Sequence, residues 1–96
     1  MSDDTVEVQH QEARSRFTAQ TDAGPAYLAY VRPDERTMDL KHTVVPKAAE
    51  GRGVGSALAR AAFAYARERG LRVVVSCPFV TEWLEKHPEE RAQLAS

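Results

Sequence analysis

The sequence predicts a mixed α/β fold of the α+β type, in which antiparallel strands come first and a β-α-β unit follows. Three observations indicate it: apolar and polar residues alternate over the first 45 residues, a glycine-rich stretch precedes alanine-rich helical spacing, and a β-branched run comes next. A chain of 96 residues can build one modest core. We therefore expect a single domain over residues 1–96.

The N-terminal part is typical of an antiparallel meander, because short alternating runs are separated by turns rich in Gly, Pro and Asp. In the last run, alternation places His42 on the same face as Leu40 and Val44, which favours a packed histidine over an exposed one. The expected strands lie around residues 6–8 and over 14–20, 26–32 and 37–45, with turns at 22–25 and 33–36.

Pro46 ends this region because it lacks the N–H that a central strand donates. From residue 53 apolar positions recur at helical intervals, which predicts a helix over 53–69 with Gly70 as its C-terminal cap. The run 71–77 is apolar on both faces and is expected to be a central strand. Together with the strand 37–45 it forms the β-α-β unit.

A short second helix is expected after Pro78. Thr81 could cap it, Trp83 and Leu84 would lie on it, and it would end near His87, because the residue before a proline disfavours helix. We expect residues 89–96 to form a short helix or a frayed tail.

Charge and cysteine content narrow the functional class. The net charge is −1, yet residues 41–60 carry four basic residues against Glu50 alone. This pattern favours a compact anionic ligand over nucleic acid. The alternative is that these basic residues simply form a solvated surface, which would have the same charge pattern. No apolar run has the roughly 20 residues of a membrane helix, and the N-terminus lacks the features of a signal peptide. With one cysteine, a cytoplasmic protein without disulfides is expected.

The glycine stretch is the strongest functional signal. Gly51, Gly53 and Gly55 lie between a strand and a helix start, where free N–H groups and the helix dipole bind phosphate. A tight turn without a ligand is the alternative. A P-loop is excluded because no Gly-Lys-Ser or Gly-Lys-Thr occurs. The dinucleotide fingerprint fails because Ser56 or Leu58 stands at its last position.

The segment 44–58 resembles the acetyl-CoA motif of the GCN5-related N-acetyltransferases. Gly53 and Gly55 match that motif, whereas Glu50 stands where the family usually has Gln or Arg. Further pieces resemble a subfamily of very short acetyltransferase-like proteins, and the likeness spans residues 13–90. These pieces are His42-Thr43, Cys77-Pro78-Phe79-Val80 and His87-Pro88-Glu89.

The resemblance implies that the sheet turns parallel where the strands 37–45 and 71–77 splay apart, with acetyl-CoA in the gap. It implies an N-acyltransferase that moves an acetyl group to an unidentified amine by direct attack. A monomer or weak dimer is expected, because so small a core could gain from a partner. The alternatives are a non-catalytic acyl-CoA-binding or interaction module and a purely structural domain. The expected cofactor-binding residues are Val44, Val45, Glu50, Gly51, Arg52, Gly53, Val54, Gly55 and Ser56.

Two residues are candidates for the chemistry. Cys77 ends a central strand beside the proposed gap, where it could accept an acyl group or simply be a small buried residue. His42 is the candidate base, and His87 is the other histidine that could neighbour the thiol, although it better fits a helix C-terminus. Trp83 and Phe79 could line a channel for the pantetheine or belong to the core. Three widely spaced histidines make a metal site improbable, so none is expected.

Overall fold

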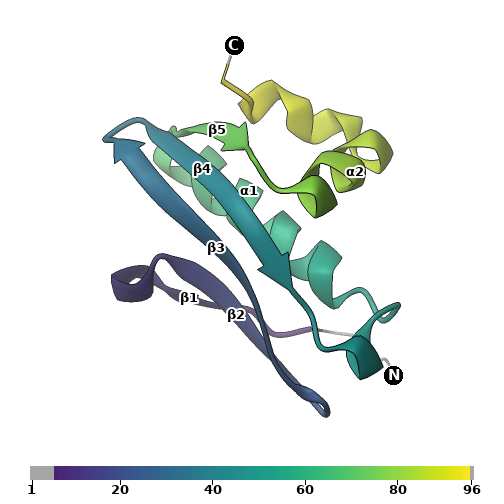
Figure 1. Ribbon diagram of the computed structural model, residues 1–96. Helices are drawn as coiled ribbons and strands as arrows, with labels where there is room; N and C mark the ends of the chain where they lie inside the picture. Colours follow the sequence, from purple (N-terminus) through teal and green to yellow (C-terminus); the bar gives the residue numbers. More distant parts are fainter. Residues whose placement is uncertain (1–5, 96) are drawn as a thin grey trace.

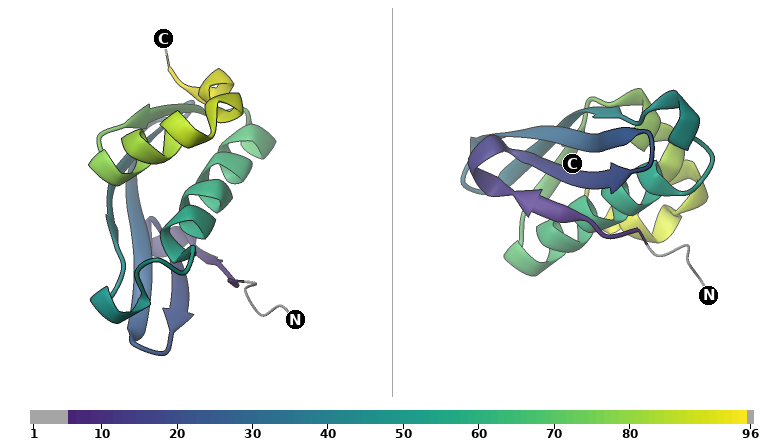
Figure 2. Two further views of the ribbon diagram at one scale, coloured as in Figure 1. Left: turned by 90° about the vertical axis from the view of Figure 1, so that its right-hand side faces the viewer. Right: turned by 90° about the horizontal axis from the view of Figure 1, so that it is seen from below.

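The computed structural model describes residues 6–95 and has two layers, a five-stranded sheet and a layer of helices on one of its faces (Figures 1 and 2). The strand order is β1-β2-β3-β4-β5. The pairs from β1 to β4 are antiparallel, and β4 pairs with β5 in parallel. This confirms the α+β prediction. The strands are β1 (Gln9–Gln11), β2 (Arg16–Thr21), β3 (Gly24–Asp34), β4 (Thr37–Val44) and β5 (Arg72–Val75).

The two α-helices lie on the same face of the sheet, as the side view in Figure 2 shows, and the other face is open. Helix α1 (Val54–Arg69) connects β4 to β5 and ends at Gly70, whose φ of +68° is the left-handed geometry of a C-terminal cap. Helix α2 (Pro78–Lys86) follows β5. Short 3-10 segments span Glu12–Arg14, Lys47–Ala49 and Pro88–Gln93.

The core fills the space between the sheet and α1. Leu58 and Phe63 of α1 meet Leu28, Met38 and Leu40 of the central strands, and all five side chains are fully buried. Among the described residues no polar or charged side chain is buried. The apolar stripe of α1 and the inward residues of the strands therefore form one continuous layer, as their periodicity predicts.

A β-bulge at Lys41 interrupts the alternation of β4. Ala29 pairs with His42 and the next residue of β3, Tyr30, pairs with Leu40, so Lys41 is an extra residue without a partner. Beyond the bulge the faces are exchanged, and His42 is exposed instead of buried. The expectation of a packed His42 is wrong, because it assumed an unbroken period of two.

Smaller differences occur at the ends of elements. Helix α2 begins at Pro78, not near Thr81, because proline suits the first helical turn, where no N–H partner is needed. The first strand lies at Gln9–Gln11, after Val6 and Val8 and not around them. His87 caps the C-terminus of α2, as expected. None of the helices formed by residues 6–95 combines the length and the apolar character required to cross a bilayer.

Candidate functional site

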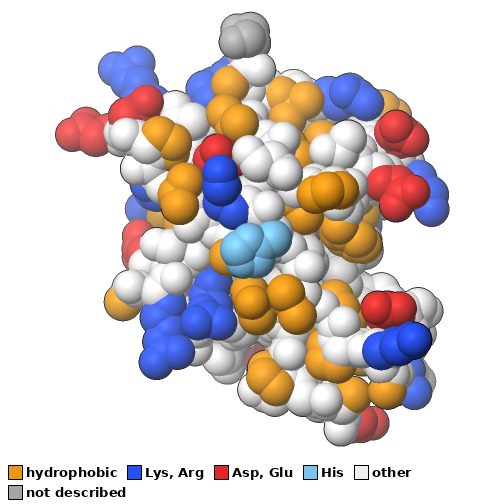
Figure 3. Space-filling view, viewed as in Figure 1, with side chains coloured by type: hydrophobic (Ala, Val, Ile, Leu, Met, Phe, Trp, Pro, Cys, Tyr) orange, Lys and Arg blue, Asp and Glu red, His pale blue; other side chains and the backbone are white. Residues whose placement is uncertain are grey.

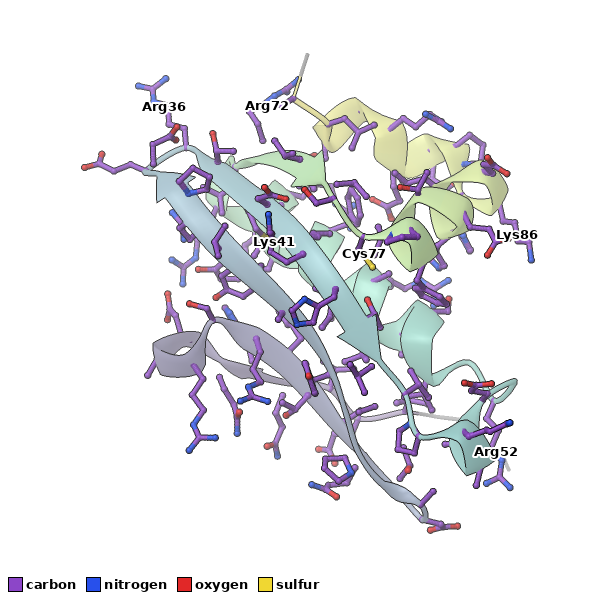
Figure 4. All side chains as sticks on the ribbon, in the orientation of Figure 1. Arg36, Lys41, Arg52, Arg72, Cys77 and Lys86 are labelled. Atoms are coloured by element: carbon purple, nitrogen blue, oxygen red, sulfur yellow. The ribbon has the colours of Figure 1, made fainter. Side chains whose placement is uncertain are left out.

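The sheet opens where β4 and β5 diverge. Their shared hydrogen bonds end where Ser76 N donates to Leu40 O at 2.9 Å. Beyond this point β4 continues to Val44, while the segment that follows β5 turns away into α2. Figure 4 shows the sulfur of Cys77 in this region, between β4 and the start of α2. The splayed parallel pair is thus formed by the two strands for which it was expected.

A cleft of about 780 Å³ begins at this opening. One wall is the end of β4, the opposite wall is α2, and the glycine loop with the first turn of α1 lies between them. Every residue expected to bind the cofactor lines the cleft except Arg52, which lines a neighbouring groove. The expected residues that line it are Val44, Val45, Glu50, Gly51, Gly53, Val54, Gly55 and Ser56.

The glycine loop presents backbone donors to the cleft. Gly51 and Gly53 have φ values of +83° and +82°, which L side chains rarely adopt, and a Cβ at either position would meet nothing within 4 Å. Gly53 is the N-cap of α1 and no side chain caps the helix. The first-turn N–H groups of residues 54–56 therefore have no intrahelical partner, and the helix dipole adds partial positive charge.

Gly55 meets a different requirement, which sequence reasoning missed. A Cβ at Gly55 would lie 2.5 Å from Cζ of Phe79, so the aromatic ring occupies the space that a side chain would need. Phe79 is 39% exposed and lines the cleft. The glycine allows the first turn of α1 and the first turn of α2 to approach closely, with the ring between them.

Trp83 links the two helices at the cleft. Its indole Nε1 donates to Ser56 Oγ at 2.8 Å, and its ring stacks on Phe63 at 5.6 Å and on His87 at 4.2 Å. Ser56 accepts this hydrogen bond and keeps its own hydroxyl proton for a further acceptor. The Ser56–Trp83 bond was not anticipated, because residues 27 positions apart show no pairing in the sequence.

Cys77 and His42 are on different sides of β4. Cys77 is 2% exposed, and its Sγ lies 3.4 Å from Oγ1 of Thr43. Neighbouring strand residues point to opposite faces, so His42 points away from the thiol. Its ring packs edge-on against Tyr27 on the open face, 6.1 Å between centroids. The structure brings Cys77 together with Thr43, a partner that the sequence did not indicate because the bulge reverses the facing of this residue.

Charges of both signs line the cleft. Glu50 and Glu82 are acidic, and Lys86 supplies a cation from α2 that was not anticipated (Figure 4). Arg52 extends at the outer end of the glycine loop. Within residues 6–95 no three His, Cys, Asp or Glu side chains come together as metal ligands would.

Comparisons with known proteins agree on one family. The family model described as GCN5-related N-acetyl-transferase matches residues 16–94. Protein NATD1 of Bos taurus is 34% identical over 85 residues, which cover 86% of this chain and 75% of that protein. Protein NATD1 of Homo sapiens is 32% identical, over 86% and 75%. The solution structure of a GCN5-like protein from Staphylococcus aureus aligns with a TM-score of 0.72 and 28% identity, over 100% of this chain and 92% of that one.

Proposed function

The chain belongs to the GCN5-related N-acetyltransferase family, and from this premise we propose that it transfers an acetyl group from acetyl-CoA to an amine. The cleft carries the proposal. It runs from the opening between β4 and β5 to the uncapped start of α1, and it is lined by eight of the nine residues expected to bind the cofactor. The opening between β4 and β5 is where we place the reaction, and the start of α1 can bind an anion. A pocket that joins these two places suits acetyl-CoA, whose acetyl group is carried at the end of a long chain that bears phosphates.

The residues of the cleft divide the binding of acetyl-CoA between them. The N–H groups of residues 54–56 and the Ser56 hydroxyl suit the pyrophosphate, because they are unpaired donors at a positive helix end. Phe79 and Trp83 offer apolar surface to the pantetheine. The end of β4 near Val44 and Val45 would hold the thioester, with a backbone N–H polarising its carbonyl.

The reaction itself needs a free amine. An amine with a pKa near 10.4 is almost entirely protonated at neutral pH, about one part in a few thousand being free. In direct attack the amine nitrogen forms a C–N bond as the C–S bond breaks, the amine loses a proton, and the departing thiolate of coenzyme A takes one. His42 points to the open face and does not line the cleft, so our candidate to receive the amine proton is a chain of water molecules that reaches the opening.

Cys77 has a supporting part in this scheme. Its thiol is buried against the Thr43 hydroxyl, and no histidine or carboxylate within residues 6–95 hydrogen-bonds to it. An acyl-enzyme route needs a thiolate and therefore an activating neighbour. We infer that Cys77 shapes the pocket at the reaction point, and that the acetyl group passes directly to the amine. A free thiol and a demand for acetyl-CoA suit the cytoplasm, and a monomer or weak dimer remains our expectation.

One observation favours a second function. The carboxylate of Glu50 lines the cleft beside the donors proposed for the pyrophosphate. Glu50 stands where the family usually has Gln or Arg, and this departure from the motif favours a chain that keeps the acyl-CoA cleft but has lost turnover. The two functions predict the same bound ligand and differ in chemistry.

Purified protein separates them when it is incubated with acetyl-CoA and a panel of small amines and amine-bearing peptides. Release of free coenzyme A and the acetylated amines are both quantified by mass spectrometry. We expect release that depends on the amine and is stoichiometric with its acetylation. Saturable acetyl-CoA binding without any acetylated product would establish the binding module, and absence of binding would refute both functions.

A further inference from the structure

A long groove runs along the outer edge of β2, on the far side of the glycine loop from the cleft, and its volume is about 1600 Å³. We propose that this groove binds an extended, acidic segment of a polypeptide partner, which adds to the sheet as a strand next to β2. The inference stands on an open sheet edge and on the arginines beside it, and it does not depend on acetyl transfer.

The edge is open because β1 is shorter than β2. Gln9–Gln11 pair only with residues 16–18, while residues 19–21 pair with β3 alone within the described range 6–95. Among the described residues, no backbone hydrogen bond joins residues 6–8 to residues 19–21. Since successive N–H and C=O groups of a strand point to opposite sides, part of this edge directs unpaired backbone groups into the groove.

Arginines from four different elements or loops line the same groove. They are Arg14, Arg16, Arg52 and Arg60. Two acidic residues, Glu7 and Asp22, also line it, so positive charge is in excess. None of these arginines is in an ion pair with another described residue. The guanidinium of Arg16 is held 4.9 Å over the ring of Tyr27, which orders it without neutralising it.

The open edge of β2 and the arginines beside it together favour a polypeptide as the ligand. Free backbone donors and acceptors at a sheet edge are matched by another backbone in the extended conformation, as in strand addition to other domains. Side chains of a strand added beside residues 19–21 would point alternately towards α1, where Arg60 lies, and towards the open face, where Arg16 lies three residues before the open edge. Carboxylates on both faces of the partner would then meet planar guanidinium groups, which bind them in bidentate geometry.

Peptide binding to the intact protein tests the proposal without any mutation. Three ten-residue peptides of equal apolar content are used: one with glutamate at four positions spread over both faces, one with glutamine there, and one with glutamate and N-methylation of alternate residues. We expect the glutamate peptide to shift the amide signals of residues 19–21 in a two-dimensional NMR titration. The glutamine peptide should bind at least about fivefold more weakly, and N-methylation should abolish the shifts.

Charge variants give the second arm. The double variant Arg16→Gln, Arg60→Gln should weaken the glutamate peptide by about fivefold or more, since each exposed pair contributes up to about 1 kcal/mol. Arg36→Gln is the matched control, because Arg36 is an exposed arginine in the β3–β4 turn, at the other end of β4 from Arg52 (Figure 4). It should bind the peptide like the unmodified protein.

The proposal would be overturned by equal binding of the glutamate and glutamine peptides, by full binding of the N-methylated peptide, or by no binding at all at millimolar peptide. Displacement of the peptide by a single-stranded oligonucleotide that causes the same amide shifts would overturn it too. Displacement by coenzyme A or by adenosine 3′,5′-bisphosphate would also overturn it, because the arginines would then serve the phosphates of the cofactor. Peptide binding that persists in saturating coenzyme A supports the groove as a separate site.

Discussion

Gly53 and Gly55 are two residues apart and are required for different reasons. Gly53 has a left-handed backbone with open space around its Cα, whereas Gly55 has ordinary helical geometry and the Phe79 ring against it. Gly53 is therefore required for its backbone conformation and for ligand access, whereas Gly55 is required for packing. Their spacing alone makes them look equivalent.

Replacing Gly53 by valine tests the ligand side of this distinction. The side chain would stand where the pyrophosphate is proposed, and we expect affinity for coenzyme A to drop at least tenfold, or about 1.4 kcal/mol, by titration calorimetry. The matched control is Gly70→Val, which puts the same residue at a similar positive φ with equally open space, at the far end of α1. Both variants should lose similar stability through backbone strain. Equal affinity in the two folded variants would remove Gly53 from the binding site.

Cys77 is tested by what survives its removal. Under direct attack, Cys77→Ala should retain transfer at about a tenth of the original rate, because packing against Thr43 is lost while no bond-forming group is. Coenzyme A binding should persist. In the unmodified protein without amine, mass spectrometry should find no acetyl group on Cys77. A stoichiometric acetyl adduct that discharges to added amine at the catalytic rate would establish the thiol as an acyl carrier instead.

At the scale of elements, the active geometry depends on how α1, α2 and β4 meet. The bulge at Lys41 decides which side chains of β4 face the helices, and the contacts of Gly55 with Phe79 and of Ser56 with Trp83 decide how closely α2 approaches α1. Each is a contact between segments far apart in sequence. The cleft is thus a product of packing between elements and not of the glycine loop alone.

A double-mutant cycle measures the approach of the two helices. Gly55→Ala should gain helix propensity, worth about 0.5–1 kcal/mol, but the new Cβ displaces the Phe79 ring, so we expect the variant to be no more stable than the original protein. In a Phe79→Ala background the same change should stabilise by the full propensity gain. Urea unfolding of the four proteins should give a coupling energy of about 1 kcal/mol. Additive effects of the two substitutions would mean that the Phe79 ring does not restrict a side chain at position 55.

The sequence predicts best those elements whose pattern lies within a short stretch of neighbouring residues. Strands β2 to β4, the helix after Gly53, its cap at Gly70 and the parallel return of β5 all follow from periodicity and turn residues. His42 was misplaced for a physical reason: Met38, Leu40, His42 and Val44 alternate without a break, and the extra residue at Lys41 becomes visible only in the pairing with β3. Thr43 beside Cys77 and Phe79 over Gly55 were missed because both depend on tertiary contact.

At the scale of the whole molecule, the helices cover one face of the sheet and leave the other open. Figure 3 shows this open face, where apolar side chains and charges of both signs surround exposed histidine. By strand alternation, Val31 and Val74 are among its exposed apolar residues. The N-terminal edge of the sheet is held to α1 by a cluster of rings around His10. Its ring stacks on Phe17 at 4.1 Å and lies edge-on to Tyr65 of α1 at 4.4 Å, and its Nε2 lies 2.6 Å from the Tyr30 hydroxyl.

This cluster makes the stability of the molecule depend on pH. Burial is the main cause that lowers the pKa of His10 below 6.5; Glu12 opposes the shift and Arg69 adds to it. The unfolded chain therefore binds the proton more readily than the folded chain, and stability falls as pH drops from about 6.5 through the lowered folded pKa. We expect the melting temperature of the original protein to fall more between pH 7.5 and pH 5 than that of His10→Gln. Parallel pH curves would show that His10 does not carry the effect.

The hydrogen bond between Trp83 and Ser56 has a practical consequence, because Trp83 is the only tryptophan of the chain. All indole emission of the protein therefore comes from one ring, 5% exposed, on the wall of the cleft and bonded to the helix turn proposed to receive phosphate. A ligand that draws on the Ser56 hydroxyl changes the polarity and hydrogen bonding around that ring. The unlabelled protein thus carries its own optical reporter of occupancy, through which stopped-flow fluorescence can follow how quickly the cleft fills and empties.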